Sequence, residues 1–97
     1  MTHETMRQQA LDRREYYAEA GDPDACFDLG MACSTGSGGI AVDLVAAHKW
    51  FNIAAAMGHA RAAECRGEIA EEMSAREVVD AQRQARALLA THMRRAA

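Results

Sequence analysis

The chain has 97 residues and a mass of 10.5 kDa, which is enough for one small domain. Hydrophobic residues make up 49%, and alanine fills 22 positions against four valines and three isoleucines, so the composition favours an all-helical domain and excludes a disordered chain or many short strands. The net charge is −3 without a polybasic tail or a long apolar run, which argues against nucleic-acid binding and membrane insertion.

The N-terminal segment and the cysteines both favour the cytoplasm. Residues 1–7 lack the apolar run of a secretory signal. The three cysteines, Cys26, Cys33 and Cys65, cannot all pair within one chain, and an odd number suits a reducing compartment. We therefore expect a cytoplasmic protein.

The first predicted helix covers residues 4–20. Its apolar positions, Met6, Ala10, Leu11 and Tyr17, are expected on the buried side. Gly21 suits the left-handed residue that ends a helix, Asp22 suits an N-cap and Pro23 the first position of a new helix. One helix should therefore end near residue 20 and a second should begin at Pro23.

The second predicted helix carries small and apolar residues at spacings of three and four: Ala25, Cys26, Leu29, Ala32 and Cys33. It should end in residues 34–39, a glycine-rich stretch that is too flexible to stay helical.

The third predicted helix begins after Asp43, its N-cap, and stops at Gly58. One apolar stripe runs along it: Ala47, Trp50, Phe51, Ala54 and Ala55. His48 and Asn52 fall outside that stripe, one turn apart, so we expect them to form a solvated pair.

Two more helices complete the pattern. The fourth is predicted over residues 60–72. Ser74 and Glu77 have the spacing of a capping box, which opens a fifth helix of about twenty residues. One side of that helix should be buried: Val78, Ala81, Ala85, Leu88 and His92.

The sequence repeats at an offset of 37 residues, the length of a two-helix solenoid unit. Four residues recur in order, since Ala18, Gly21, Ala25 and Gly30 correspond to Ala55, Gly58, Ala62 and Gly67. These positions are expected at a helix stop and at tight contacts between helices, where small size matters.

The same residues resemble the Sel-one-like repeat, a relative of the tetratricopeptide repeat. The resemblance rests on an ordered set of structural positions: Ala25, Leu29, Gly30, Gly36, Asp43, Ala47, Trp50, Ala54, Ala55, Gly58 and Ala62. Two features depart from the family, because Cys33 stands where a tyrosine is usual and the glycine loop is one residue longer. The expected domain therefore has an N-terminal helix at 4–20, the best repeat at 21–58, and a degenerate repeat with a capping helix at 59–93.

The resemblance implies a short α-α superhelix of about five antiparallel helices whose first helices line a concave face. It also implies a role as an adaptor or scaffold, in a small bacterial cytoplasmic protein. On that architecture, residues of the second helix and their offset-37 equivalents should line the face and bind a partner protein: Asp24, Asp28, Met31, Arg61, Cys65 and Glu68. No catalytic motif is present, so we expect neither an enzyme nor a cofactor.

Two alternatives stay open from the sequence. Cys26, Cys33 and Cys65 could serve a zinc or thiol redox sensor, with His48 or His59 as a further ligand, although no Cys-x2-Cys spacing supports it. A short solenoid also gains core by self-association, so the chain could instead be a homodimeric structural module.

Overall fold

A computed structural model of the chain describes residues 17–96, and these residues form helices and turns without a strand. Residues 17–19 are the end of a helix, and the elements that follow are α2 (Pro23–Thr35), the 3-10 turn η1 (Ser37–Gly39), α3 (Leu44–Ala56), α4 (Ala62–Ala70) and α5 (Ala75–Ala96). The predicted all-helical fold is thus confirmed. The body of the helix predicted at 4–20, with Met6, Ala10 and Leu11, lies outside the described residues.

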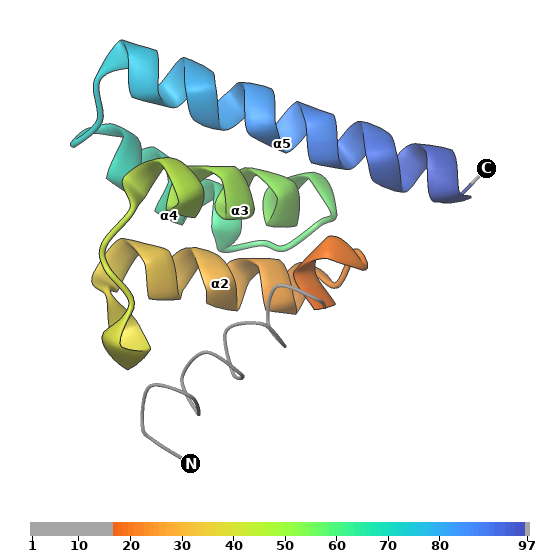
Figure 1. The fold of residues 1–97 in the computed structure, drawn as a ribbon, viewed down its shortest axis with the longest axis horizontal. Coiled ribbons are helices and arrows are strands. Elements are labelled where there is room, and N and C mark those ends of the chain that lie inside the picture. Colours follow the sequence, from red (N-terminus) through yellow and green to blue (C-terminus); the bar gives the residue numbers. More distant parts are fainter. Residues whose placement is uncertain (1–16, 97) are drawn as a thin grey trace.

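The central element of the described chain is α3. It packs against α2, α4 and α5, and in Figure 1 α2 and α5 flank it while α4 lies behind it. The hairpin of α2 and α3 is joined by the glycine-rich turn and residues 40–43. This arrangement is that of a helical repeat, in which one helix pair stacks on the next.

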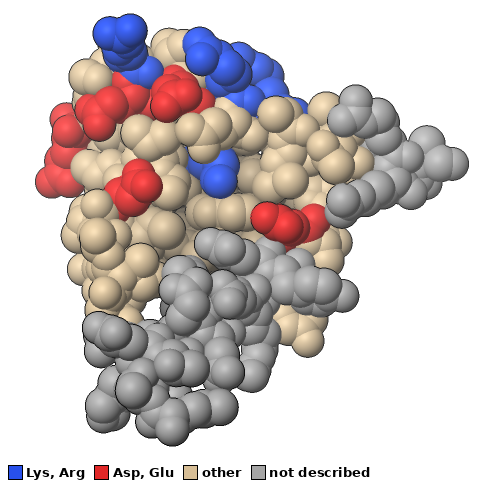
Figure 2. Space-filling view, in the orientation of Figure 1, with Lys and Arg blue, Asp and Glu red and all other residues tan. Residues whose placement is uncertain are grey.

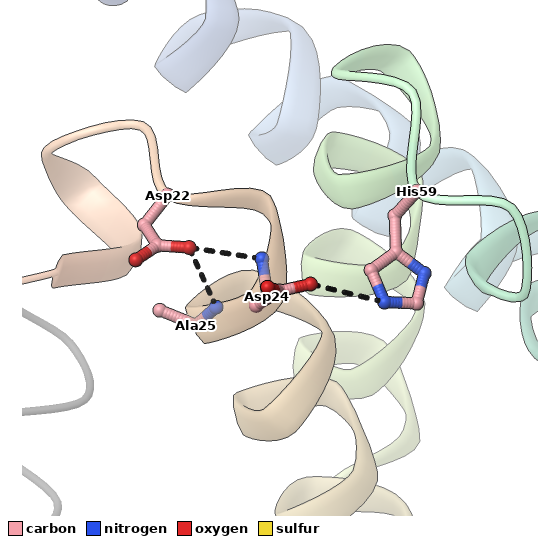
Figure 3. Close-up of polar contacts among 4 residues, drawn as sticks. All are labelled: Asp22, Asp24, Ala25 and His59. Atoms are coloured by element: carbon pink, nitrogen blue, oxygen red, sulfur yellow. Dashed lines mark hydrogen bonds and ion pairs between the residues drawn. The ribbon is translucent and has the colours of Figure 1, made fainter.

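The start of α2 follows the sequence prediction. Gly21 has φ +94°, the left-handed conformation that glycine adopts without strain. The Asp22 side chain accepts hydrogen bonds from the backbone N–H groups of Asp24 (3.0 Å) and Ala25 (3.2 Å), as Figure 3 shows. Two of the free N–H groups at this helix end are therefore satisfied, and Pro23 occupies a position that needs none.

The other predicted caps are confirmed as well. Asp43 accepts a hydrogen bond from the Ala46 N–H at 3.0 Å. Ser74 and Glu77 form the reciprocal pair of a capping box: the Ser74 N–H donates to Glu77 (2.9 Å) and the Glu77 N–H donates to the Ser74 hydroxyl (3.1 Å). The helix that follows has 22 residues. The fourth helix is shorter than the predicted 60–72, because residues 71–74 form the turn into α5.

The repeat positions take the structural places expected of them. Leu29, Gly30, Ala47, Trp50, Ala54 and Ala62 are buried, and Ala25 and Ala55 are half-buried against the core. Gly36 (φ +73°) ends α2, and Gly58 (φ +94°) follows the end of α3. On α5, Ala81 and Ala85 are completely buried.

The expectation of a solvated pair at His48 and Asn52 is wrong. His48 is only 3% exposed, and Asn52 is half-buried and accepts a hydrogen bond from the Arg66 guanidinium at 2.7 Å. The reason is that α3 is covered on three sides, so its buried surface extends beyond one stripe and also takes in Ile53.

Two smaller expectations also fail. Tyr17 is 50% exposed, so it does not lie on a buried side. Gly67, the repeat equivalent of Gly30, has no atom within 4 Å of an added Cβ and is not a close helix contact. Gly67 in the second unit is therefore not packed against a neighbouring helix, as Gly30 in the first unit is packed against Phe51.

Candidate functional site

One side of α2 faces outward and carries Asp24, Asp28 and Met31. Spacings of four and three residues place the three side chains in one row along the helix. Asp24 and Asp28 are exposed, and Met31, a large apolar residue, is 37% exposed. The opposite side of the same helix is buried in the core through Cys26, Leu29 and Cys33. The packing of α2 on α3 thus fixes which residues this row presents.

A histidine and a phenylalanine hold the start of α4 beside the first turns of α2. The His59 ring stacks on the Phe27 ring, with 4.2 Å between centroids and 13° between planes. His59 Nε2 also lies 3.5 Å from Asp24 Oδ1 (Figure 3). The Arg61 guanidinium lies 5.7 Å from the centre of the Phe27 ring, a cation–π contact. These contacts connect Asp24 and Arg61 through one aromatic pair.

The α4 side of this surface contains Arg61, Cys65 and Glu68. Arg61 and Glu68 are exposed, as is Glu64, whereas Cys65 is half-buried and packs against the core. Cys65 therefore offers less surface than its neighbours. We use the name α2–α4 face for the six predicted residues taken together: Asp24, Asp28, Met31, Arg61, Cys65 and Glu68. The contacts of His59 and Arg61 with Phe27 and Asp24 bring its α2 and α4 parts together at the start of both helices.

Sequence reasoning missed Phe27, His59 and Glu64 as members of this region. The signal for Phe27 was its place three residues after Asp24 and four before Met31, which puts it at the edge of the same helix face. His59 had no such signal, because its position depends on the path of the turn that follows Gly58.

The charged residues of the α2–α4 face are mostly acidic. Asp24 and Asp28 on α2 and Glu68 on α4 carry negative charge, the exposed Glu64 is a further acid on α4, and Arg61 is the cation of the set. Exposed charges of this kind set orientation and association rate more than affinity, while an exposed methionine supplies adaptable apolar contact.

The cysteines do not belong to a metal-binding cluster within residues 17–96. No three His, Cys, Asp or Glu side chains of this range gather where they could hold a metal ion. The Cys26 thiol is buried and donates to the Ala18 carbonyl at 3.4 Å. Burial, with the negative charge of Asp22 as a smaller cause, raises the pKa of Cys26 to about 11, so its thiolate is disfavoured.

The described helices also contain no membrane span, since none in this range combines the required length and apolar character. A hollow on the other side of α3 is lined by Trp50, Lys49, Val42, Glu19 and Glu77, among others. Its charged residues have mixed signs, and Lys49 lies 4.4 Å from the centre of the Trp50 ring. It presents no cluster of reactive groups.

Comparison with known families gives one match. The family model of the Sel1 repeat matches residues 23–59, which comprise α2, the glycine-rich turn, α3 and the residues through His59. No curated protein and no solved structure matches the chain.

Proposed function

Because this chain is a Sel1-like repeat protein, with its repeat at residues 23–59, and Sel1 repeats generally mediate protein–protein interaction, we propose that it is a small adaptor. Its binding surface in this proposal is the α2–α4 face, which docks a segment of a partner protein. The role requires no cofactor and no catalytic group, and it would be exercised in the cytoplasm.

The observation that carries the proposal is the position of Met31. A methionine 37% exposed stands on a helix whose other side is buried, in one row with the two exposed carboxylates Asp24 and Asp28. Burying this side chain against a partner is favourable, because apolar surface is removed from water. The carboxylates would then orient the partner segment around that contact.

The experiment that tests the adaptor role is photo-crosslinking in the source cells. A photoreactive phenylalanine analogue replaces Met31, and captured proteins are identified by mass spectrometry. The matched control carries the analogue at Val42, an apolar residue 58% exposed in the loop before α3. We expect a protein that is captured from position 31 and not from position 42.

A pair of substitutions checks that the capture depends on the face. Asp28→Arg with Met31→Arg should abolish co-purification of the captured protein, while circular dichroism shows an unchanged helical signal because both residues are exposed. A partner that binds the folded variant as well as the wild type would move the binding site away from the α2–α4 face.

A further inference from the structure

The outward side of α5 carries three arginines and one valine in a row: Arg76, Val79, Arg83 and Arg86. We call this row the basic stripe. Spacings of three, four and three residues align them along one side of the helix. All four are exposed, Val79 to 48%, and Arg76, Val79 and Arg83 line a hollow together with Asp80 and Glu77. Figure 2 shows basic side chains gathered over α5, along the upper edge of the molecule.

This basic stripe is opposite in charge and similar in spacing to the row of Asp24, Asp28 and Met31 on α2. From Met31, Asp28 and Asp24 lie three and seven residues back along α2. From Val79, Arg83 and Arg86 lie four and seven residues forward along α5. With a rise of about 1.5 Å per residue, the outer charges stand about 10.5 Å from the apolar residue on both helices, and the inner charges differ by one residue.

The match requires the two helices to be antiparallel. Met31 then meets Val79, while Asp28 and Asp24 face Arg83 and Arg86. Arg76 falls beyond Met31, near Thr35 at the C-terminal end of α2, where the helix dipole favours a cation. Each arginine of the basic stripe would thus face a carboxylate or the C-terminal end of a helix, and Val79 would face Met31.

The two surfaces cannot meet within one copy of the chain. In Figure 1, α2 and α5 lie on opposite sides of α3, against which both pack. Ala81 and Ala85 of α5 are buried toward the interior, so the basic stripe points away from the rest of the molecule. Within residues 17–96, neither Asp28 nor Arg83 forms an ion pair.

We propose that α5 of a second copy of this chain docks on the α2–α4 face, antiparallel to α2. The inference rests on the proposed function, since it names an occupant of the same face. It goes further in identifying that occupant as the chain's own basic helix. Self-association would then hold the face covered until a partner with a comparable basic helix displaces it.

The first measurement is the molar mass in solution by sedimentation equilibrium, at low and high protein concentration in 50 mM and 500 mM salt. We expect a mass that rises from 10.5 kDa with concentration at low salt. Because the paired charges are exposed, the association should weaken at high salt. A mass of 10.5 kDa under all four conditions would overturn the proposal.

Charge reversal then tests the pairing of Asp28 with Arg83. Asp28→Arg alone and Arg83→Asp alone each place like charges opposite one another, and each should weaken association roughly tenfold or more. The double variant restores opposite charges and should associate again, and an equimolar mixture of the two single variants should do the same. Failure of both the double variant and the mixture to associate would overturn the proposed pairing.

The matched control is Glu72→Arg, the same change of charge at an exposed site in the turn before α5. It should leave the association constant unchanged, and an effect equal to that of Asp28→Arg would overturn the assignment to these two helices. The experiments distinguish a failure of the self-association proposal from a failure of the proposed adaptor role. A protein that stays monomeric and still captures a different protein from position 31 retains the proposed function and loses this inference.

Discussion

The aromatic ring of Phe51 lies directly against Gly30: a Cβ added at Gly30 would be 2.6 Å from ring atom Cδ1. This contact joins α2 to α3 at the centre of the Sel1 repeat. At the equivalent position of the second unit, Gly67 has open space around it. Close packing therefore accounts for glycine at position 30 and not at position 67.

Substitution of these glycines should separate the two cases. Gly30→Ala is expected to destabilise the protein by about 1–3 kcal/mol, because the methyl group forces Phe51 out of its packed position. Gly67→Ala should be neutral or stabilising by up to about 1 kcal/mol, since alanine favours the helix and meets no obstacle. Urea unfolding followed by circular dichroism measures both, and equal losses would contradict the packing described for α2 and α3.

The Trp50 side chain is expected to supply a large share of the stability. It is 5% exposed, and truncation of a buried large aromatic residue costs about 3–5 kcal/mol. Because a small domain has about 5–15 kcal/mol in total, Trp50→Ala should leave the protein only marginally folded at 25 °C. Trp50→Phe should retain more of the stability, and thermal unfolding of the two variants gives the comparison.

The buried His48 predicts that stability falls in mild acid. Burial, together with the nearby Arg66 cation, lowers the pKa of His48 below its ordinary value of 6.5, and Nδ1 has no hydrogen-bond partner among the described residues. The unfolded chain therefore binds a proton at a higher pH than the folded chain. The free energy of unfolding should be highest above about pH 6.5 and should decrease as the pH falls below it.

The measurement for His48 is the urea midpoint at a series of pH values between 7.5 and 5. His48→Gln should flatten this dependence, because glutamine does not titrate. A variant whose pH dependence equals that of the wild type would show that His48 is not the responsible group.

Thiol chemistry should distinguish Cys26 from Cys65. With its pKa raised to about 11 and its side chain buried, Cys26 should resist iodoacetamide at pH 8, whereas the half-buried Cys65 should react first. Peptide mapping after timed alkylation identifies the modified residue, and full modification in urea serves as the control. Fast labelling of Cys26 in the folded protein would contradict its burial.

The capping box at the start of α5 is a further testable contribution. Ser74→Ala removes the acceptor of the Glu77 N–H and should cost about 1 kcal/mol. Ser74→Asp keeps an acceptor at the N-cap and should retain most of the stability. Urea midpoints of the two variants decide whether the hydroxyl acts through this hydrogen bond.

The starts of α2, α3 and α5 could be predicted from the sequence, because caps are local chemistry, whereas α4, which has no side-chain cap, is shorter than predicted. Gly21, Asp22 and Pro23 end one helix and start another within three residues, and Ser74 and Glu77 open α5 through bonds only three residues apart. The order of small residues around Trp50 was also sufficient to indicate the repeat, since a helix pair must bury a face of this kind.

Only the tertiary structure showed which helices cover α3 and that the space beside Gly67 in the second unit is open. His48 is buried because α4 and α5 pack on α3 in addition to α2, which one helical stripe cannot reveal. The Phe51 ring fills the space beside Gly30, while the space beside Gly67 is open, although the two glycines occupy equivalent repeat positions. The Phe27–His59 stack depends on the turn between α3 and α4. Such contacts join residues distant in sequence, so their physical cause is the packing of whole helices and not any local preference.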